Sequence, residues 1–234
     1  MNYAWDWGLV LREPYAGWLI AGVAWTLALS AAGWALALIL ALPVALLRVL
    51  GSPAIRWLAG FYVSVFRNIP LILQMFVWFF VVPELMPRDL GLWVKRDMPQ
   101  PEFTTAVVAL GMYTSGRLAE LFRSGIDAVP RGQVSAALAC GLTRAQAYQY
   151  VILPQAFRII LAPLTSEFLS IVKNSSIALT IGVVELTAES RQIEDMTFHG
   201  FEAFGAATLI YVVIAFGLDR MAARLRPSAL AVRT

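Results

Sequence analysis

Long uncharged stretches alternate with short charged ones along this chain. Residues 14 to 47 contain no charged residue, whereas a helix needs only about 20 residues to cross roughly 30 Å of hydrocarbon. Residues 203 to 218 are also uncharged. Three more apolar stretches carry one or two charges each: residues 57 to 83, 103 to 122 and 159 to 184. The pattern predicts an all-α membrane protein with about five transmembrane helices.

Basic residues gather in alternate connections between the predicted spans. Ten Lys and Arg and two acidic residues lie in one set, residues 48 to 56, 123 to 158 and 219 to 234. Five basic and eleven acidic residues lie in the other set, residues 1 to 17, 84 to 102 and 184 to 202. Because short cytoplasmic loops carry an excess of Lys and Arg, we expect the N-terminus outside and the C-terminus in the cytoplasm.

The composition supports a membrane protein and excludes several other classes. Apolar residues make up 59% of the chain and charged residues 14%, against about 45–50% and about 25% in soluble domains. We therefore expect residues 1 to 234 to form one membrane-embedded domain. The net charge of +3 comes without a dense basic tract, so we expect no nucleic-acid partner. A single Cys140 and a single His199 predict no metal site and no catalytic residues.

The connection before the fourth predicted span has the pattern of two short helices. Gln133 to Cys140 form the first, and Gly141 is placed to end it as a left-handed cap. Thr143 and Gln146 have the spacing of a capping box that opens the second, and Pro154 predicts a turn into the span. We expect a helical hairpin that offers a docking surface for a soluble partner.

Short motifs lie within this hairpin and around it. Within it lie Ala136-Ala137, Gly141-Leu142 and Ile152-Leu153-Pro154-Gln155-Ala156. Around it lie Phe66-Arg67-Asn68, Pro70-Leu71, Gln74, Ala119-Glu120, Val129-Pro130, Lys173-Asn174-Ser175-Ser176 and Ile181-Gly182-Val183. Together they resemble bacterial ABC importer permeases of the polar amino-acid branch, in which the hairpin is the "EAA" loop. Ser135 stands where the glutamate of that loop usually lies.

The resemblance implies a fold, a location and a set of partners. The fold would be that of a type I importer permease in the bacterial inner membrane, with a coupling loop at about residues 129 to 156. Its partners would be a second permease subunit, a cytoplasmic ATPase dimer that binds ATP and Mg, and a periplasmic amino-acid-binding protein, besides membrane lipids. Coupling to the ATPase would fall to Ser135, Ala136, Ala137, Gly141, Leu142 and Pro154. The serine at position 135 slightly favours a heterodimer of permeases over a homodimer.

The chain itself has no site for ATP. A P-loop requires a lysine directly after glycine, and the two lysines, Lys95 and Lys173, both follow valine. We therefore expect ATP hydrolysis on a separate subunit and no enzymatic activity in this one.

Ionisable residues inside the predicted spans require an explanation, since each costs about 2.5–3.5 kcal/mol at the bilayer centre. Arg117 and Glu120 are three residues apart and could pair with each other. Glu167 and Lys173 lie about 120° apart around a helix, so they need separate partners. We predict that a substrate path is lined by Arg117, Glu120, Glu167, Lys173, Asn174, Ser175 and Ser176. The alternative is that these polar groups join helices to one another.

The substrate is indicated by resemblance alone. Tyr113-Thr114-Ser115 before Arg117, with Thr165-Ser166-Glu167-Phe168, is most similar to permeases for glutamate and aspartate, which implies import of these amino acids from periplasm to cytoplasm. An ion-coupled secondary transporter is the alternative, but such proteins usually contain internal repeats with broken helices, and the sequence has no evident repeat. A membrane enzyme would need a catalytic set that the lone cysteine and histidine do not provide.

Overall fold

The computed structural model describes residues 3 to 225, and these form helices without any strand. The α-helices are α1 (Tyr15–Leu50), α2 (Pro53–Asn68), α3 (Leu71–Phe76), α4 (Val82–Leu85), α5 (Arg88–Arg96), α6 (Pro101–Asp127), α7 (Arg131–Ala139), α8 (Arg144–Ala147), α9 (Leu153–Asn174), α10 (Leu186–Thr197) and α11 (Gly200–Leu225). Short 3-10 helices lie at Leu9–Leu11 and Ser175–Ile181, and π-helical turns at Val77–Val81 and Tyr148–Ile152.

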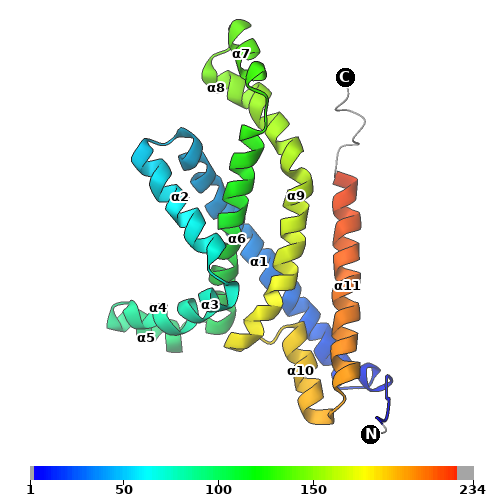
Figure 1. Ribbon diagram of the computed structural model, residues 1–234. Helices are drawn as coiled ribbons and strands as arrows, with labels where there is room; N and C mark the ends of the chain where they lie inside the picture. Colours follow the sequence, from blue (N-terminus) through cyan, green and yellow to red (C-terminus); the bar gives the residue numbers. More distant parts are fainter. Residues whose placement is uncertain (1–2, 226–234) are drawn as a thin grey trace.

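The long helices form an elongated bundle with distinct ends (Figure 1). The hairpin of α7 and α8 extends from one end, and α10 with the N-terminal segment lies at the other. Tyr15–Leu50, Arg144–Ile181 and Gly200–Arg224 are long and apolar enough to cross a membrane. Helix α6 has 27 residues, enough to extend about 40 Å, and it packs between α1 and α9. The all-helical membrane architecture agrees with the sequence prediction.

The prediction of one continuous span over residues 57 to 83 is wrong. Helix α2 and the segment Leu71–Leu85 meet at an angle of 105°. Pro70 has no N–H and disfavours helical geometry in the preceding residue, and Ile69 is extended, with ψ at 128°. The Gln74 amide donates to the carbonyls of Phe66 and Ile69 at 3.0 and 2.9 Å, so it satisfies backbone groups that the break would leave free.

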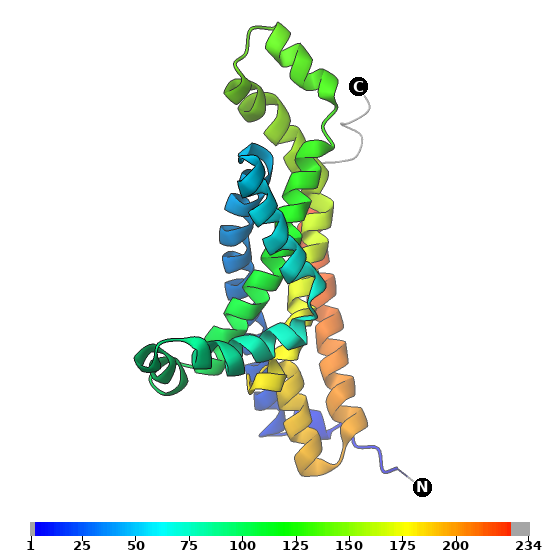
Figure 2. The ribbon, with the colours of Figure 1, turned by 60° about the vertical axis from the view of Figure 1, so that its left-hand side comes forward.

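The bend directs the chain away from the bundle. Both views show α4 and α5 as an arm that projects sideways near the end where α10 lies (Figure 2). The arm returns to the bundle at Pro101, where α6 begins.

The fourth predicted span, residues 159 to 184, differs from the observed helix at both ends. Helical structure starts at Arg144 and runs to Ile181, and the α-helical part ends at Asn174. Gly182 then takes a positive φ of 94°, a conformation that glycine adopts without strain. The Glu185 carboxylate caps α10 by accepting from the N–H groups of Thr187 and Ala188, each at 2.9 Å. Burial raises the pKa of this Glu185 carboxyl.

Helix α1 connects the two ends of the bundle. Its 36 residues extend about 54 Å, and it packs against α2, α6, α9 and α10. Close approach depends on small residues: a Cβ atom at Gly22 would lie 2.7 Å from the Leu186 Cα. In the same region, the Leu186 N–H donates to the Thr26 hydroxyl at 3.2 Å. Helix α1 is therefore fixed to α10 at the end that carries the N-terminal segment.

Candidate functional site: a polar path and a coupling hairpin

The hairpin has the capped geometry that the sequence predicts. Gly141 follows α7 with φ at 83°, and the Leu142 N–H reaches back to the Ala137 carbonyl at 3.2 Å, as in a Schellman cap. The Thr143 hydroxyl and the Gln146 side chain form a reciprocal capping box at the start of α8. These two caps reverse the chain within a few residues and fix the angle between the two short helices.

The predicted turn at Pro154 is wrong. Residues 148 to 152 form a π-helical turn in which the Leu153 N–H donates to the Tyr148 carbonyl, and α9 follows directly with Pro154 in its first turn. A π-turn widens the helix by one residue, which accommodates a proline that cannot donate to a preceding carbonyl. The hairpin is thus joined to α9 by continuous helix rather than by a flexible link.

The predicted coupling residues divide into exposed and inward-facing groups. Ser135, Ala136 and Gly141 are exposed, Leu142 is half-buried, and Ala137 is buried. Exposed apolar side chains lie beside them, with Leu138 at 40% and Tyr150 at 63% exposure. The hairpin therefore presents a mixed apolar and polar surface beyond the end of the bundle (Figure 1).

Arg117 does not pair with Glu120, the partner that spacing along the helix suggested. Its guanidinium donates from Nε and Nη2 to both oxygens of Glu167, at 2.7 and 2.8 Å. This two-pronged geometry is the strongest that arginine makes with a carboxylate. The Tyr113 ring lies 5.9 Å from the guanidinium carbon. The contact joins α6 to α9 and leaves the pair without net charge.

Glu120 lies in a second cluster, closer to the hairpin end of α6. Its carboxylate accepts from Arg48 on α1 and from Arg123, whose Nε and Nη2 lie 3.2 and 2.6 Å away. Arg67 approaches it at 3.8 Å. Sequence reasoning missed Arg48, although it is the first charge after the long uncharged run of α1. One carboxylate thus joins α1, α2 and α6, and it is surrounded by three arginines.

The Lys173 motif is spread over different environments. Lys173 is exposed and Asn174 half-buried, whereas Ser175 is fully buried and donates to the Val172 carbonyl at 2.7 Å. Ser176 donates to the Lys173 carbonyl at 2.8 Å. The four residues thus range from exposed to fully buried, so the structure does not bring the whole motif to one surface.

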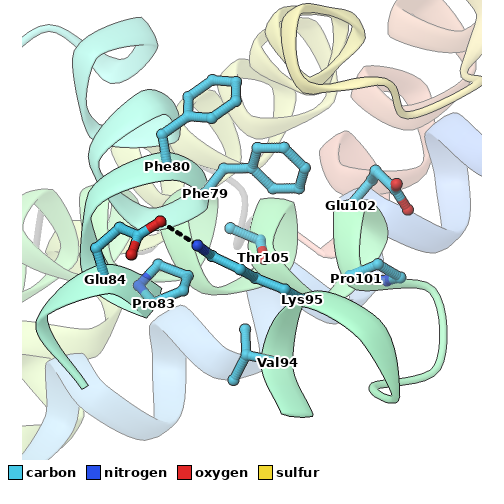
Figure 3. A pocket seen from close by; sticks show the side chains of 9 residues that line it. All are labelled: Phe79, Phe80, Pro83, Glu84, Val94, Lys95, Pro101, Glu102 and Thr105. Atoms are coloured by element: carbon cyan, nitrogen blue, oxygen red, sulfur yellow. Dashed lines mark hydrogen bonds and ion pairs between the residues drawn. The ribbon is translucent and has the colours of Figure 1, made fainter. Parts of the chain in front are cut away.

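A separate cavity of about 270 Å³ lies between the projecting arm and the start of α6. Figure 3 shows the rings of Phe79 and Phe80 on one side and the ion pair of Lys95 with Glu84 below them. Glu102 also lines it. Since the one cation is already paired and a second carboxylate is present, the cavity carries a net negative charge. It therefore does not suit an anionic ligand.

Comparison with known proteins identifies the class. Residues 33–230 match the family described as "Binding-protein-dependent transport system inner membrane component". The chain belongs to this family, and it is a permease subunit of an ATP-binding cassette importer rather than an ion-coupled secondary transporter. The all-helical fold, with its elongated bundle and the hairpin of α7 and α8, agrees with that assignment.

Particular relatives are similar over nearly the whole chain. Glutamate/aspartate import permease protein GltJ of Escherichia coli (strain K12) is 41% identical over 92% of this chain and 90% of its own length. Glutamate/aspartate import permease protein GltK of Escherichia coli O157:H7 is 28% identical over 96% and 98%. The chain is also similar to a structure titled "Crystal structure of an amino acid ABC transporter with histidines", with a TM-score of 0.83, 30% identity, and coverage of 96% of this chain and 99% of that one.

Proposed function

We propose that this permease imports an acidic amino acid, glutamate or aspartate, from the periplasm into the cytoplasm. The carrying observation is the 41% identity to GltJ over 92% of the chain. Chemistry on the amino acid is not part of the function. The protein moves the substrate by alternating between outward-open and inward-open states.

The substrate path in this proposal follows the polar side chains of α6 and α9. Glu167 and Arg117 join the two helices midway along the path, Lys173 and Asn174 lie further toward the outside, and Glu120 closes the inner end within its arginine cluster. Ser175 and Ser176 support the backbone there through bonds to their own helix.

The partners in the proposal follow from the class of transporter. The exposed hairpin surface at Ser135, Ala136 and Leu138 docks a cytoplasmic ATPase dimer, which carries the ATP and Mg. A periplasmic binding protein delivers the amino acid, and a second permease subunit completes the path. Similarity to both GltJ and GltK supports a pair of related permeases.

Reconstitution tests the proposed function directly. Proteoliposomes that contain this chain with its second permease, ATPase and binding protein should accumulate radiolabelled glutamate only when ATP is present on the ATPase side. Uptake driven by an ion gradient without ATP, or by vesicles that lack the ATPase, would contradict the proposal.

The orientation is tested by cysteine labelling. The native Cys140 is exposed on the hairpin, so a membrane-impermeant maleimide should label it only after permeabilisation of the cells. In a Cys140→Ser background, Asp97→Cys and Glu194→Cys should react in intact cells and Arg144→Cys should not. This expectation follows from the opposite charge balance of the two sets of connections. Reaction of Arg144→Cys in intact cells would reverse the topology.

A further inference from the structure

Lys173 lies in a helix that is long and apolar enough to cross a membrane, next to a packed core. It lies at the penultimate position of α9, directly after Ile171 and Val172, which are buried in the main apolar cluster with Leu110 and Met75. Six residues separate it from Glu167, which corresponds to about 9 Å along the helix axis. Lys173 therefore lies on the exposed surface of α9, on the outer side of the Arg117–Glu167 pair.

Lys173 has no acidic partner in residues 3 to 225. The ion pairs of that part of the chain include Arg67 and Arg117, the other basic residues of the predicted spans, but not Lys173. Its side chain is exposed on the surface of the subunit. An ammonium group facing lipid at this depth would be strongly unfavourable, so its surroundings must provide water or negative charge.

Two hydroxyls extend the polar surface around Lys173. Ser166, Ser170 and Lys173 are spaced four and three residues apart, which places them on one face of α9. The two serines donate to carbonyls of their own helix, Ala162 at 3.4 Å and Ser166 at 2.8 Å. Their oxygens keep free acceptor capacity. This face is suited to a hydrated path rather than to lipid.

Arg117 on α6 and Lys173 on α9 differ in whether their positive charge is neutralised. The charge of Arg117 is neutralised by a carboxylate that accepts two of its hydrogen bonds, whereas Lys173 keeps its full charge. We propose that Lys173, and not Arg117, supplies the positive charge that selects an anionic amino acid in the membrane path. This inference rests on the proposed import of glutamate or aspartate.

The test compares two nearly isosteric probes on the complete importer in lipid nanodiscs. Glutamate and glutamine differ in one charge, and binding without the binding protein isolates the contribution of the membrane path. Lys173→Gln should weaken equilibrium binding of radiolabelled glutamate at least ten-fold and change glutamine binding less than two-fold. Lys173→Arg should keep the preference for glutamate. Arg191→Gln removes an exposed positive charge from α10 and should leave both affinities unchanged.

Each outcome bears on a defined part of the proposal. If the wild-type complex prefers glutamate and Lys173→Gln keeps that preference at normal assembly, the role of Lys173 is wrong and the import of acidic amino acids stands. If the wild-type complex binds glutamine as well as glutamate and imports both equally, the proposed substrate class and the role of Lys173 both fail. Loss of binding for both probes in Lys173→Gln and Lys173→Arg alike would assign Lys173 to packing.

Discussion

Replacing Arg117 by leucine should lower the amount of assembled importer at least ten-fold. The change leaves Glu167 without the guanidinium that now donates two hydrogen bonds to it, and an unpaired charge within the bilayer costs about 2.5–3.5 kcal/mol. A second substitution, Glu167→Gln, removes the stranded charge and should restore most of the assembly. Size-exclusion chromatography of the complex, calibrated by immunoblot, measures the effect.

The matched control is Glu120→Gln in the same background. Glu120 lies among Arg48, Arg67 and Arg123, so its neutralisation adds a second defect and should not rescue Arg117→Leu. Arg117→Lys keeps the charge with fewer donors and should assemble at close to the normal level, with an unchanged preference for glutamate over glutamine. Equal rescue by Glu120→Gln and Glu167→Gln would show that the observed pairing does not hold in the membrane.

Replacing Gly141 by valine should release the ATPase from the purified complex. A β-branched residue is strongly disfavoured at a positive φ, and the left-handed conformation costs about 1–2 kcal/mol for residues with a Cβ. A Cβ atom at Gly141 would meet nothing within 4 Å, so the penalty comes from the backbone and changes the angle between α7 and α8. The amount of ATPase that remains bound to the purified complex and the rate of substrate-stimulated ATP hydrolysis are the two measurements, and both should fall.

The same hairpin provides a control for this substitution. Gly132 is exposed in α7, and its Cβ would also meet nothing within 4 Å, but its φ is ordinary. Gly132→Val should therefore retain the ATPase, and Gly141→Asn should retain it too because asparagine tolerates the left-handed region. If Gly141→Val keeps its ATPase and its stimulated hydrolysis, the hairpin is not the coupling element.

Local signals in the sequence were sufficient for the all-helical class and for the hairpin caps. A capping box and a left-handed glycine depend on residues only a few positions apart, so Thr143, Gln146 and Gly141 could be assigned from spacing. The break at Ile69 was missed because an apolar composition does not reveal a bend, although Pro70 was visible. Pro154 led to the opposite error: a turn was predicted there, but a π-helical turn at residues 148 to 152 keeps the chain helical through the proline.

Partners across the bundle could not be predicted in the same way. Arg117 and Glu120 satisfy the spacing rule for helical pairs. In the structure, however, Arg117 pairs with Glu167, which is 50 residues away from it in sequence. Arg48 reaches Glu120 across 72 residues. Which residues pair across the bundle depends on how the helices face one another, and a single sequence does not specify that arrangement. The functional class was predictable because its motifs occur together at fixed intervals.

The long helix α1 connects the two ends of the bundle mechanically. Toward one end of helix α1, the Thr26 hydroxyl accepts a hydrogen bond from the Leu186 N–H. Toward the other end, Arg48 donates to Glu120. Between Gly22 and Leu42 it contains no proline and extends about 30 Å. A pivot of about 10° at its centre would therefore carry each end about 3 Å in opposite directions. Movement of α1 at the hairpin end of the bundle would therefore be accompanied by movement at the α10 end, without any change in the length of the helix.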